Sequence, residues 1–249
     1  MIEEPVKPPE PLTLDTNLLA ELIADKVQST LNLPRKKCGI PIKDYPKTQG
    51  VFVRENVGKR YLAKPEVLEG QEWVFDHGVQ AVDKLHGTNV CVILDKQGNV
   101  LAIDNRTQRL QDGMQLDVRN AKDQSRAMIG VFEAAKRGWF KDIHLEDDFT
   151  RVYGELIGPG INGNMHEVSG PTFVPFQHLK GSCAWKSWVE GRYPKNFESL
   201  SESFKELPSL FSKKYCQRDI LAEGLVFWHP DGRLAKLRRD MFEWYKKGE

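Results

Sequence analysis

Hydrophobic and polar positions alternate with a period of two in several short stretches of the chain, a pattern typical of half-buried β-strands. The stretches "VQAVDKLHG" (79–87), "NVCVILD" (89–95) and "VLAIDNR" (100–106) follow one another closely, and the turn "KQGN" separates the last two. We therefore predict an antiparallel meander over 79–106. Further strands are predicted in "TRVYGELI" (150–157) and "TFVPFQHL" (172–179), and a hairpin in "LAEGLVFW" (221–228) and "RLAKLRR" (233–239).

Apolar residues recur at helical spacing in other segments. After the capping residue Asp15, this spacing predicts an amphipathic helix that ends before Pro34 and whose apolar face is Leu18, Leu19, Leu22, Ile23 and Val27. Helices are also predicted over 118–138 and 197–207, and a closing helix over 240–248. Helices mixed with mostly antiparallel strands indicate the α+β class.

The first residues differ in composition from the rest. Residues 1–14 are polar and rich in proline, so we expect a flexible tail there. We expect an N-terminal helix and accessory segment over 15–80 and the main domain over 81–249.

Composition excludes several classes of protein. Lysine and arginine number 36 and aspartate and glutamate 35, which leaves a net charge of +1 and no overall polycation to bind nucleic acid, so any such binding has to use local patches. No apolar stretch approaches the length of a membrane helix, and the first residues show no apolar region typical of a signal peptide, so we expect neither. The four cysteines form no CxxC pair, which argues against a zinc ribbon or a disulfide scaffold and favours a reducing cytosol: Cys38, Cys91, Cys183 and Cys216.

Lys84 is the first candidate for chemistry, because a charge interrupts the apolar run "VDKLHGTNVCVIL" (82–94). Strand alternation puts Lys84 and His86 on the same side, and Gly87 then permits a tight turn. An amine at this position could approach a phosphate closely and act as a nucleophile. Taken alone, however, Lys-x-x-Gly occurs often by chance.

Two cations and two carboxylates lie farther along the chain. Alternation places Lys236 and Arg238 on one face of the last strand, where they match a phosphate, although for the pair taken alone a solvated basic strand is the simpler explanation. Glu155 and Glu223 sit among apolar residues, each beside a glycine. Such acids need a cation or a metal as partner, so a structural salt bridge and a Mg²⁺ site both remain open.

These pieces occur in a recognisable order: Lys-x-x-Gly, Gly-Glu, an aromatic strand, Glu-Gly and Lys-x-cation. Across residues 82 to 240 the chain resembles the covalent nucleotidyltransferase superfamily of polynucleotide ligases and capping enzymes. Within it, "KLHGTN" (84–89) and "GELIGPGINGN" (154–164) most resemble the phage-type nick-sealing RNA ligases. The resemblance implies a nucleotidyltransferase (ATP-grasp-like) domain of antiparallel sheets flanked by helices.

The resemblance also implies roles for single residues. Lys84 would take AMP from ATP as a lysyl-adenylate, and Glu223 with Glu155 would bind Mg²⁺ or Mn²⁺. Phe176 would stack on adenine, with Phe173 as its alternative. The implied nucleotide-binding residues are Val82, Asp83, His86, Gly87, Thr88, Asn89, Arg106, Glu155, Phe176, Glu223, Lys236 and Arg238.

The chain departs from the superfamily pattern at three places. Gln177 stands where many relatives have an acid, Trp228 and His229 stand where motif IV often continues to a lysine, and Arg238 replaces a lysine. Outside the motifs, we expect Trp228 to belong to the core and the remaining histidines to be structural or on the surface: His77, His144, His166 and His178.

The resemblance implies an ATP-dependent RNA ligase that joins 5′-phosphate and 3′-hydroxyl ends and acts as a monomer in the cytoplasm, or in the host cytoplasm if viral. Only 11 residues follow Arg238, so we expect no C-terminal OB domain. Arg54, Lys59 and Arg60 are further candidates for pyrophosphate or strand binding. The alternatives are an inactive module that binds RNA ends and a DNA ligase or capping-type nucleotidyltransferase.

Overall fold

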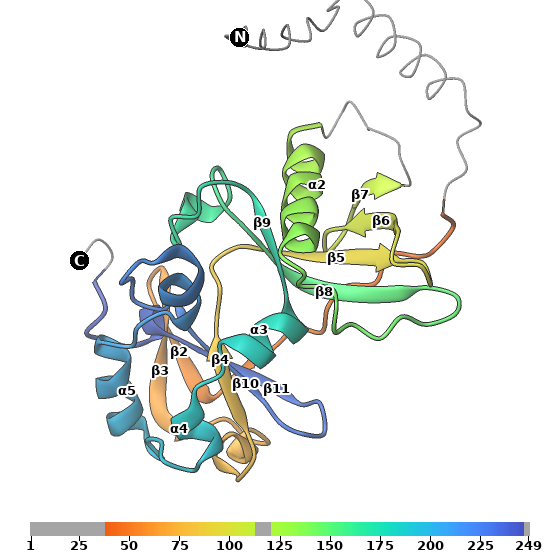
Figure 1. Ribbon diagram of the computed structural model, residues 1–249. Coiled ribbons are helices and arrows are strands. Elements are labelled where there is room, and N and C mark those ends of the chain that lie inside the picture. The colour runs from red at the N-terminus through yellow and green to blue at the C-terminus, as the bar shows by residue number, and fades with distance from the viewer. Residues whose placement is uncertain (1–37, 113–120, 247–249) are drawn as a thin grey trace, which may run out of the picture. The chain divides into compact units, whose positions relative to one another are not determined.

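A computed structural model describes residues 38–112 and 121–246. They form two larger β-sheets and a separate hairpin with helices packed around them (Figure 1), which confirms the α+β class. The tail predicted over 1–14 and the helix predicted between Asp15 and Pro34 lie outside the described residues. Within these residues, no helix is both long and apolar enough to cross a bilayer.

One sheet has five antiparallel strands in the order β7-β6-β5-β8-β9. Their bounds are β5 (Thr88–Leu94), β6 (Val100–Asp104), β7 (Arg109–Asp112), β8 (Thr150–Ile157) and β9 (Thr172–Pro175). Along β5 the side chains alternate as the sequence predicts: Val90, Val92 and Leu94 belong to the main core, whereas Cys91 and Ile93 belong to a smaller cluster. This alternation gives the five-stranded sheet two buried faces.

Helix α2 (Ala121–Lys136) covers the first of these faces, as Figure 1 shows. Ala127, Val131 and Ala134 pack into the same core as Val92. Gly130 permits the close approach, because a Cβ there would lie 2.5 Å from a methyl carbon of Leu156.

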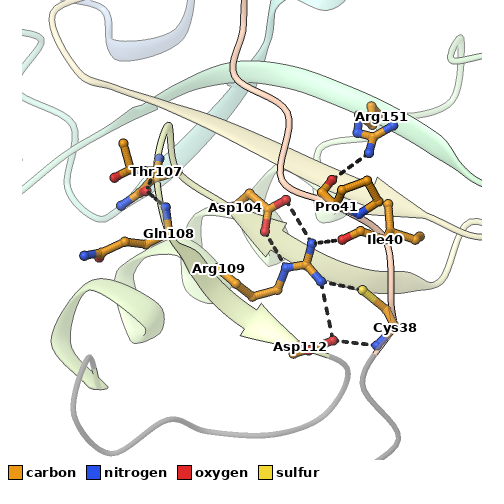
Figure 2. Close-up of polar contacts among 10 residues, drawn as sticks. Cys38, Ile40, Pro41, Asp104, Thr107, Gln108, Arg109, Asp112 and Arg151 are labelled. Carbon is orange, nitrogen blue, oxygen red and sulfur yellow. Dashed lines mark hydrogen bonds and ion pairs between the residues drawn. The ribbon is translucent and has the colours of Figure 1, made fainter.

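The segment 38–45 crosses the opposite face of the five-stranded sheet as an extended strap (Figure 2). At its start, the Arg109 guanidinium donates to Sγ of Cys38, to the carbonyl of Ile40 and to both oxygens of Asp104, and Asp112 accepts from the amide of Cys38. Farther along, the strap carbonyls accept from Arg151 and Tyr153. Side chains of the sheet therefore fix the course of this segment.

The second sheet has four strands in the order β1-β11-β10-β4. Their bounds are β1 (Gln49–Gly50), β4 (Gln80–Asp83), β10 (Gly224–Trp228) and β11 (Leu234–Arg238). Strand β1 pairs with β11 in parallel, and the other pairs are antiparallel. A second core lies against this sheet and includes residues of the hairpin β2 (Phe52–Val57) and β3 (Arg60–Val67).

Short helices pack around the four-stranded sheet: η1 (Glu72–Phe75), α4 (Lys186–Val189), α5 (Phe197–Lys205) and η5 (Arg239–Met241). Helix η4 (Ser212–Cys216) packs against the main core instead, whereas η3 (Asn162–Asn164) follows β8 and α3 (Phe176–Ser182) follows β9. In the described residues, the chain passes between the two sheets three times: at 46–48, at 84–87 and through α3.

Several sequence predictions are confirmed by these elements. Strand β8 has the predicted bounds, the hairpin of β10 and β11 forms, and α2 and α5 occupy most of the two predicted helices.

Three other predictions are wrong. Strand β4 does not join the meander, because it pairs with β10 in the other sheet. The strand predicted over 172–179 ends at Pro175, and α3 begins at Phe176. The predicted closing helix is replaced by the single turn η5, and residues 242–246 form no helix.

Candidate active site

Lys84 lies at the point where the chain leaves the four-stranded sheet. It follows β4, and its backbone N–H donates to the carbonyl of Gly224 on β10 at 2.9 Å. Its Nζ lies 2.8 Å from Oε2 of Glu223, and the two side chains are 21% and 14% exposed. The amine is thus held beside a carboxylate at the edge of the sheet and remains accessible to solvent.

The accessible part of Lys84 faces a cavity of about 810 Å³. Residues from both sheets and from all three crossings line it. Many of the sequence candidates are among them: Val82, Asp83, Lys84, Gly87, Thr88, Asn89, Arg106, Glu155, Phe176 and Lys236. The structure thereby brings together residues that are distant in the sequence, such as Val82 and Lys236, which lie 154 positions apart.

Cations gather at one part of this cavity. Lys236 is half-buried on β11, and burial lowers its pKa; the positive charges of Lys84, Arg238, Arg54 and Arg106 lower it further. Lys84, Arg106 and Arg238 each lie near a carboxylate, whereas no ion pair within the described residues involves Lys236 or Arg54. A phosphate or polyphosphate would supply the missing charge.

Arg238 differs from the other cations in its position. It does not line the cavity, and its Nε lies 3.1 Å from Oδ1 of Asp240. Of the predicted pair, Lys236 therefore lines the cavity, whereas Arg238 forms an ion pair, although both residues belong to β11. Arg54 takes a place in the cavity wall instead.

Glu155 lies across the cavity on β8, opposite Asn89 of β5. Its Oε1 accepts from the amide of Gly87 at 3.1 Å, which ties the Lys84 loop to the five-stranded sheet. Burial raises the pKa of Glu155 to about 7; the charge of Lys84 opposes this effect and that of Glu223 adds to it. Two carboxylates close enough to repel each other suit a divalent cation.

The residues present thus fit such an ion. Among the described residues, no group of three or more histidine, cysteine, aspartate or glutamate side chains could hold a metal without other ligands. Glu155 and Glu223 would need oxygen atoms of a bound phosphate to complete the coordination.

Gly87 is required for the loop to reach the five-stranded sheet. A Cβ at this position would lie 2.3 Å from the carbonyl oxygen of Leu156. The carbonyl of Gly87 accepts from the side chain of Asn162, which belongs to the glycine-rich loop after β8. Backbone contacts therefore fix both ends of the four-residue passage from Lys84 to Gly87.

Aromatic side chains form another part of the cavity wall. Phe176, the first residue of α3, lies 4.9 Å from Tyr45 and 6.3 Å from Trp228 between ring centroids, and all three line the cavity. Phe173 is fully buried against Phe140, so it is not the alternative that the sequence suggested. Such a surface suits the flat face of a nucleobase.

Sequence reasoning missed part of this wall. Trp228 packs against the main core, as expected, but it also lines the cavity, which the sequence did not indicate. The end of the strap, the crossing after it and the first residue of β1 contribute a continuous run that no sequence motif marks: Tyr45, Pro46, Lys47, Thr48 and Gln49. Only tertiary packing brings these residues to the cavity wall.

Other candidates lie outside the cavity. His86 and Glu223 do not line it, although both adjoin residues that do. Arg60 donates to three backbone carbonyls near the end of the chain, so its role is structural. His166 is buried, as expected for a structural histidine.

No protein-family model and no curated protein matches the chain. Among solved structures, an apo mutant of Naegleria gruberi RNA ligase R4a aligns over 76% of this chain and 58% of its own, at 16% identity and a TM-score of 0.43. A Naegleria gruberi RNA ligase mutant with ATP and Mn aligns over 80% and 60%, at 16% identity and a TM-score of 0.41. The chain thus spans about three fifths of the length of these two ligases. These TM-scores lie below 0.5, so neither family nor activity follows from them.

Proposed function

We propose that the protein is an ATP-dependent RNA ligase of the covalent nucleotidyltransferase superfamily, of the phage-type branch, with Lys84 as its nucleophile. The supporting observation is the position of Lys84 Nζ: it lies 2.8 Å from the Glu223 carboxylate and faces a cavity lined by cations, by Glu155 and by an aromatic wall. These three features match the triphosphate, the metal ion and the base of ATP.

In the first step, the amine of Lys84 attacks the α-phosphorus of ATP. A nitrogen–phosphorus bond forms, the bond from the α-phosphorus to the pyrophosphate oxygen breaks, and pyrophosphate leaves. Glu223, 2.8 Å from the amine, accepts the proton that the nitrogen loses. Lys236 and Arg54 neutralise the charge on the phosphates.

In the second step, an oxygen of an RNA 5′-phosphate displaces the lysine nitrogen, and AMP passes to the RNA end. In the third step, a 3′-hydroxyl gives its proton to water and attacks the phosphorus of the RNA 5′-phosphate. The phosphodiester bond forms, the bond from this phosphorus to the bridging oxygen of AMP breaks, and AMP leaves. Both steps require mainly positioning and charge neutralisation. Bound Mg²⁺ or Mn²⁺ would shield the phosphate charges, held by Glu155 and Glu223.

Covalent labelling tests the first step. The protein is mixed with Mg²⁺ and ATP radiolabelled at the α-phosphate, and adduct is measured on a denaturing gel. Wild type should carry label and Lys84→Ala should not. Lys205→Ala is the matched control, because Lys205 also pairs with a glutamate, Glu202, but on the exposed face of α5. Label that persists in Lys84→Ala would contradict the assignment.

A joining assay tests the substrate. Nicked duplex RNA, single-stranded RNA ends, a broken tRNA loop and nicked DNA are offered in parallel, each with ATP or GTP. We expect joining of RNA with ATP. Retention of RNA without any adduct would favour the binding module, and joining of DNA or use of GTP would favour the DNA ligase or capping alternatives.

A further inference from the structure

The residues on both sides of Lys84 are held by buried polar groups that the proposed reaction does not use. Asp83 precedes Lys84 and His86 follows it by two positions. Each makes hydrogen bonds to groups from farther along the chain, and both sets of partners meet in the segment 209–212.

On the first side, Asp83 is 1% exposed at the end of β4. Its Oδ2 accepts from the hydroxyl of Ser209 at 2.9 Å and from the amide of Phe211 at 2.8 Å. Burial raises the pKa of Asp83 to about 6, and these two hydrogen bonds oppose the rise. A carboxylate so placed cannot move without leaving buried donors unpaired, which is costly.

On the second side, the amide of His86 donates to Nε2 of His166 at 3.0 Å. His166 is 1% exposed, and burial lowers its pKa to about 4, so the ring is neutral at pH 7. Since Nε2 accepts a hydrogen bond, the ring proton is on Nδ1. This nitrogen lies 3.0 Å from Oγ of Ser212 and donates to it.

The two sides are joined within the segment itself. The amide of Ser212 donates to Oγ of Ser209 at 3.0 Å. An unbroken series of hydrogen bonds therefore runs from the Asp83 carboxylate through Ser209, Ser212 and His166 to the His86 amide. Ser212 also begins the π-helical turn η4, a distortion that is frequent at functional sites.

We infer that Ser209, Ser212 and His166 are positioning residues that hold the backbone around Lys84 so that its amine points into the cavity. The expected effect on catalysis rests on the proposed function. The geometry of the positioning rests on the hydrogen bonds alone. None of the three lines the cavity. They act on Lys84 only through Asp83 and His86.

Two substitutions of His166 separate its two nitrogen atoms. His166→Gln places an oxygen at the position of Nε2 and keeps an acceptor for the His86 amide. His166→Asn places an amide nitrogen near the position of Nδ1 and keeps only the contact with Ser212. Ser212→Ala removes the hydroxyl partner, and Ser201→Ala is its control, because the Ser201 hydroxyl accepts from Trp244 away from the cavity.

The rate of adduct formation at saturating ATP and the affinity for ATP are measured for each variant. We expect His166→Asn and Ser212→Ala to form adduct at least about tenfold more slowly, with ATP affinity within about threefold of wild type. His166→Gln should retain more activity than His166→Asn, and Ser201→Ala should match wild type. Equal rates in His166→Gln and His166→Asn would overturn the inference.

Amide hydrogen exchange over residues 84–87 provides a second measurement that needs no ATP. Exchange should be faster in His166→Asn than in wild type and should be restored toward wild type in His166→Gln. If the wild-type protein forms no adduct, the proposed function is refuted. The exchange measurement then still tests whether His166 holds the backbone over residues 84–87. Unchanged exchange in His166→Asn would overturn the positioning role.

Discussion

Nζ of Lys84 and Oε2 of Glu223 lie 2.8 Å apart, although the two residues are 139 positions apart in sequence. Both side chains are largely buried, so each charge depends on the other for compensation. The same contact that stabilises the protein before reaction places a proton acceptor next to the proposed nucleophile.

Glu223→Gln should therefore slow adduct formation by about 10²-fold, because the amide cannot accept the amine proton as a carboxylate does. Single-turnover labelling with ATP measures this rate. Glu202→Gln provides the control, since Glu202 pairs with Lys205 on the surface. A Glu223→Gln rate equal to wild type would mean that the proton leaves by another route.

Lys236 and Arg238 should differ in effect because only Lys236 lines the cavity. Lys236→Ala removes a cation from the proposed phosphate site and should lower the rate of adduct formation by about 10²–10³-fold. Arg238→Ala, which loses its pair with Asp240, should have a smaller effect. The reverse order would show that the two side chains exchange places when ATP binds.

Phe176→Ala should weaken ATP binding by about 1–3 kcal/mol, the usual contribution of stacking on a base. Calorimetric titration with ATP in the Lys84→Ala background measures this affinity without turnover. Phe132 is 67% exposed and lies outside the cavity, so Phe132→Ala should leave the affinity unchanged. Equal affinity in Phe176→Ala and its parent would exclude the aromatic wall as the base site.

Gly87→Ala should destabilise the protein by about 1–3 kcal/mol or more, because its methyl group would meet the backbone of Leu156. Urea denaturation measures the free energy of unfolding. Gly181 in α3 has open space around it, so Gly181→Ala is expected not to destabilise. Equal stability in the two variants would show that the passage from Lys84 to Gly87 can shift freely.

His166 should make the free energy of unfolding depend on pH. Its pKa is about 4 in the folded protein and 6.5 in a model peptide, so the unfolded chain binds more protons between these values. The stabilisation is complete above 6.5 and is lost as the pH falls toward 4. From pH 7 to pH 5 this loss is about 2 kcal/mol.

The comparison of wild type with His166→Gln isolates this contribution from that of other acids. The difference in free energy of unfolding between pH 7 and pH 5 should be smaller in His166→Gln by that amount. Parallel pH profiles in the two proteins would mean that folding does not shift the pKa of His166.

The sequence was sufficient to predict elements whose apolar pattern is local. Alternation identified β5 and β8, and helical spacing identified α2 and α5. The pairing of β4 with β10 was missed, because alternation shows which face of a strand is buried but not which strand lies beside it.

The site was predicted unevenly for a similar reason. Lys84, Glu155 and Phe176 were found because they belong to motifs, and the cavity brings them together. Tyr45 and Trp228 were missed as cavity residues, since nothing in their local sequence indicates the neighbours that packing gives them. Arg238 lies on the same strand face as Lys236, but it pairs with Asp240, two positions later, and does not line the cavity.

The three crossings between the sheets all contribute to the cavity wall: Lys47 in the first, Lys84 in the second and Phe176 in the third. Any rotation of one sheet against the other must bend these connections, and it would therefore change the width of the cavity. A molecule bound in the cavity would contact both sheets and so restrict their relative rotation. Occupancy of the cavity and the rigidity of this part of the chain are consequently linked, so a bound nucleotide should slow amide exchange in both sheets at once.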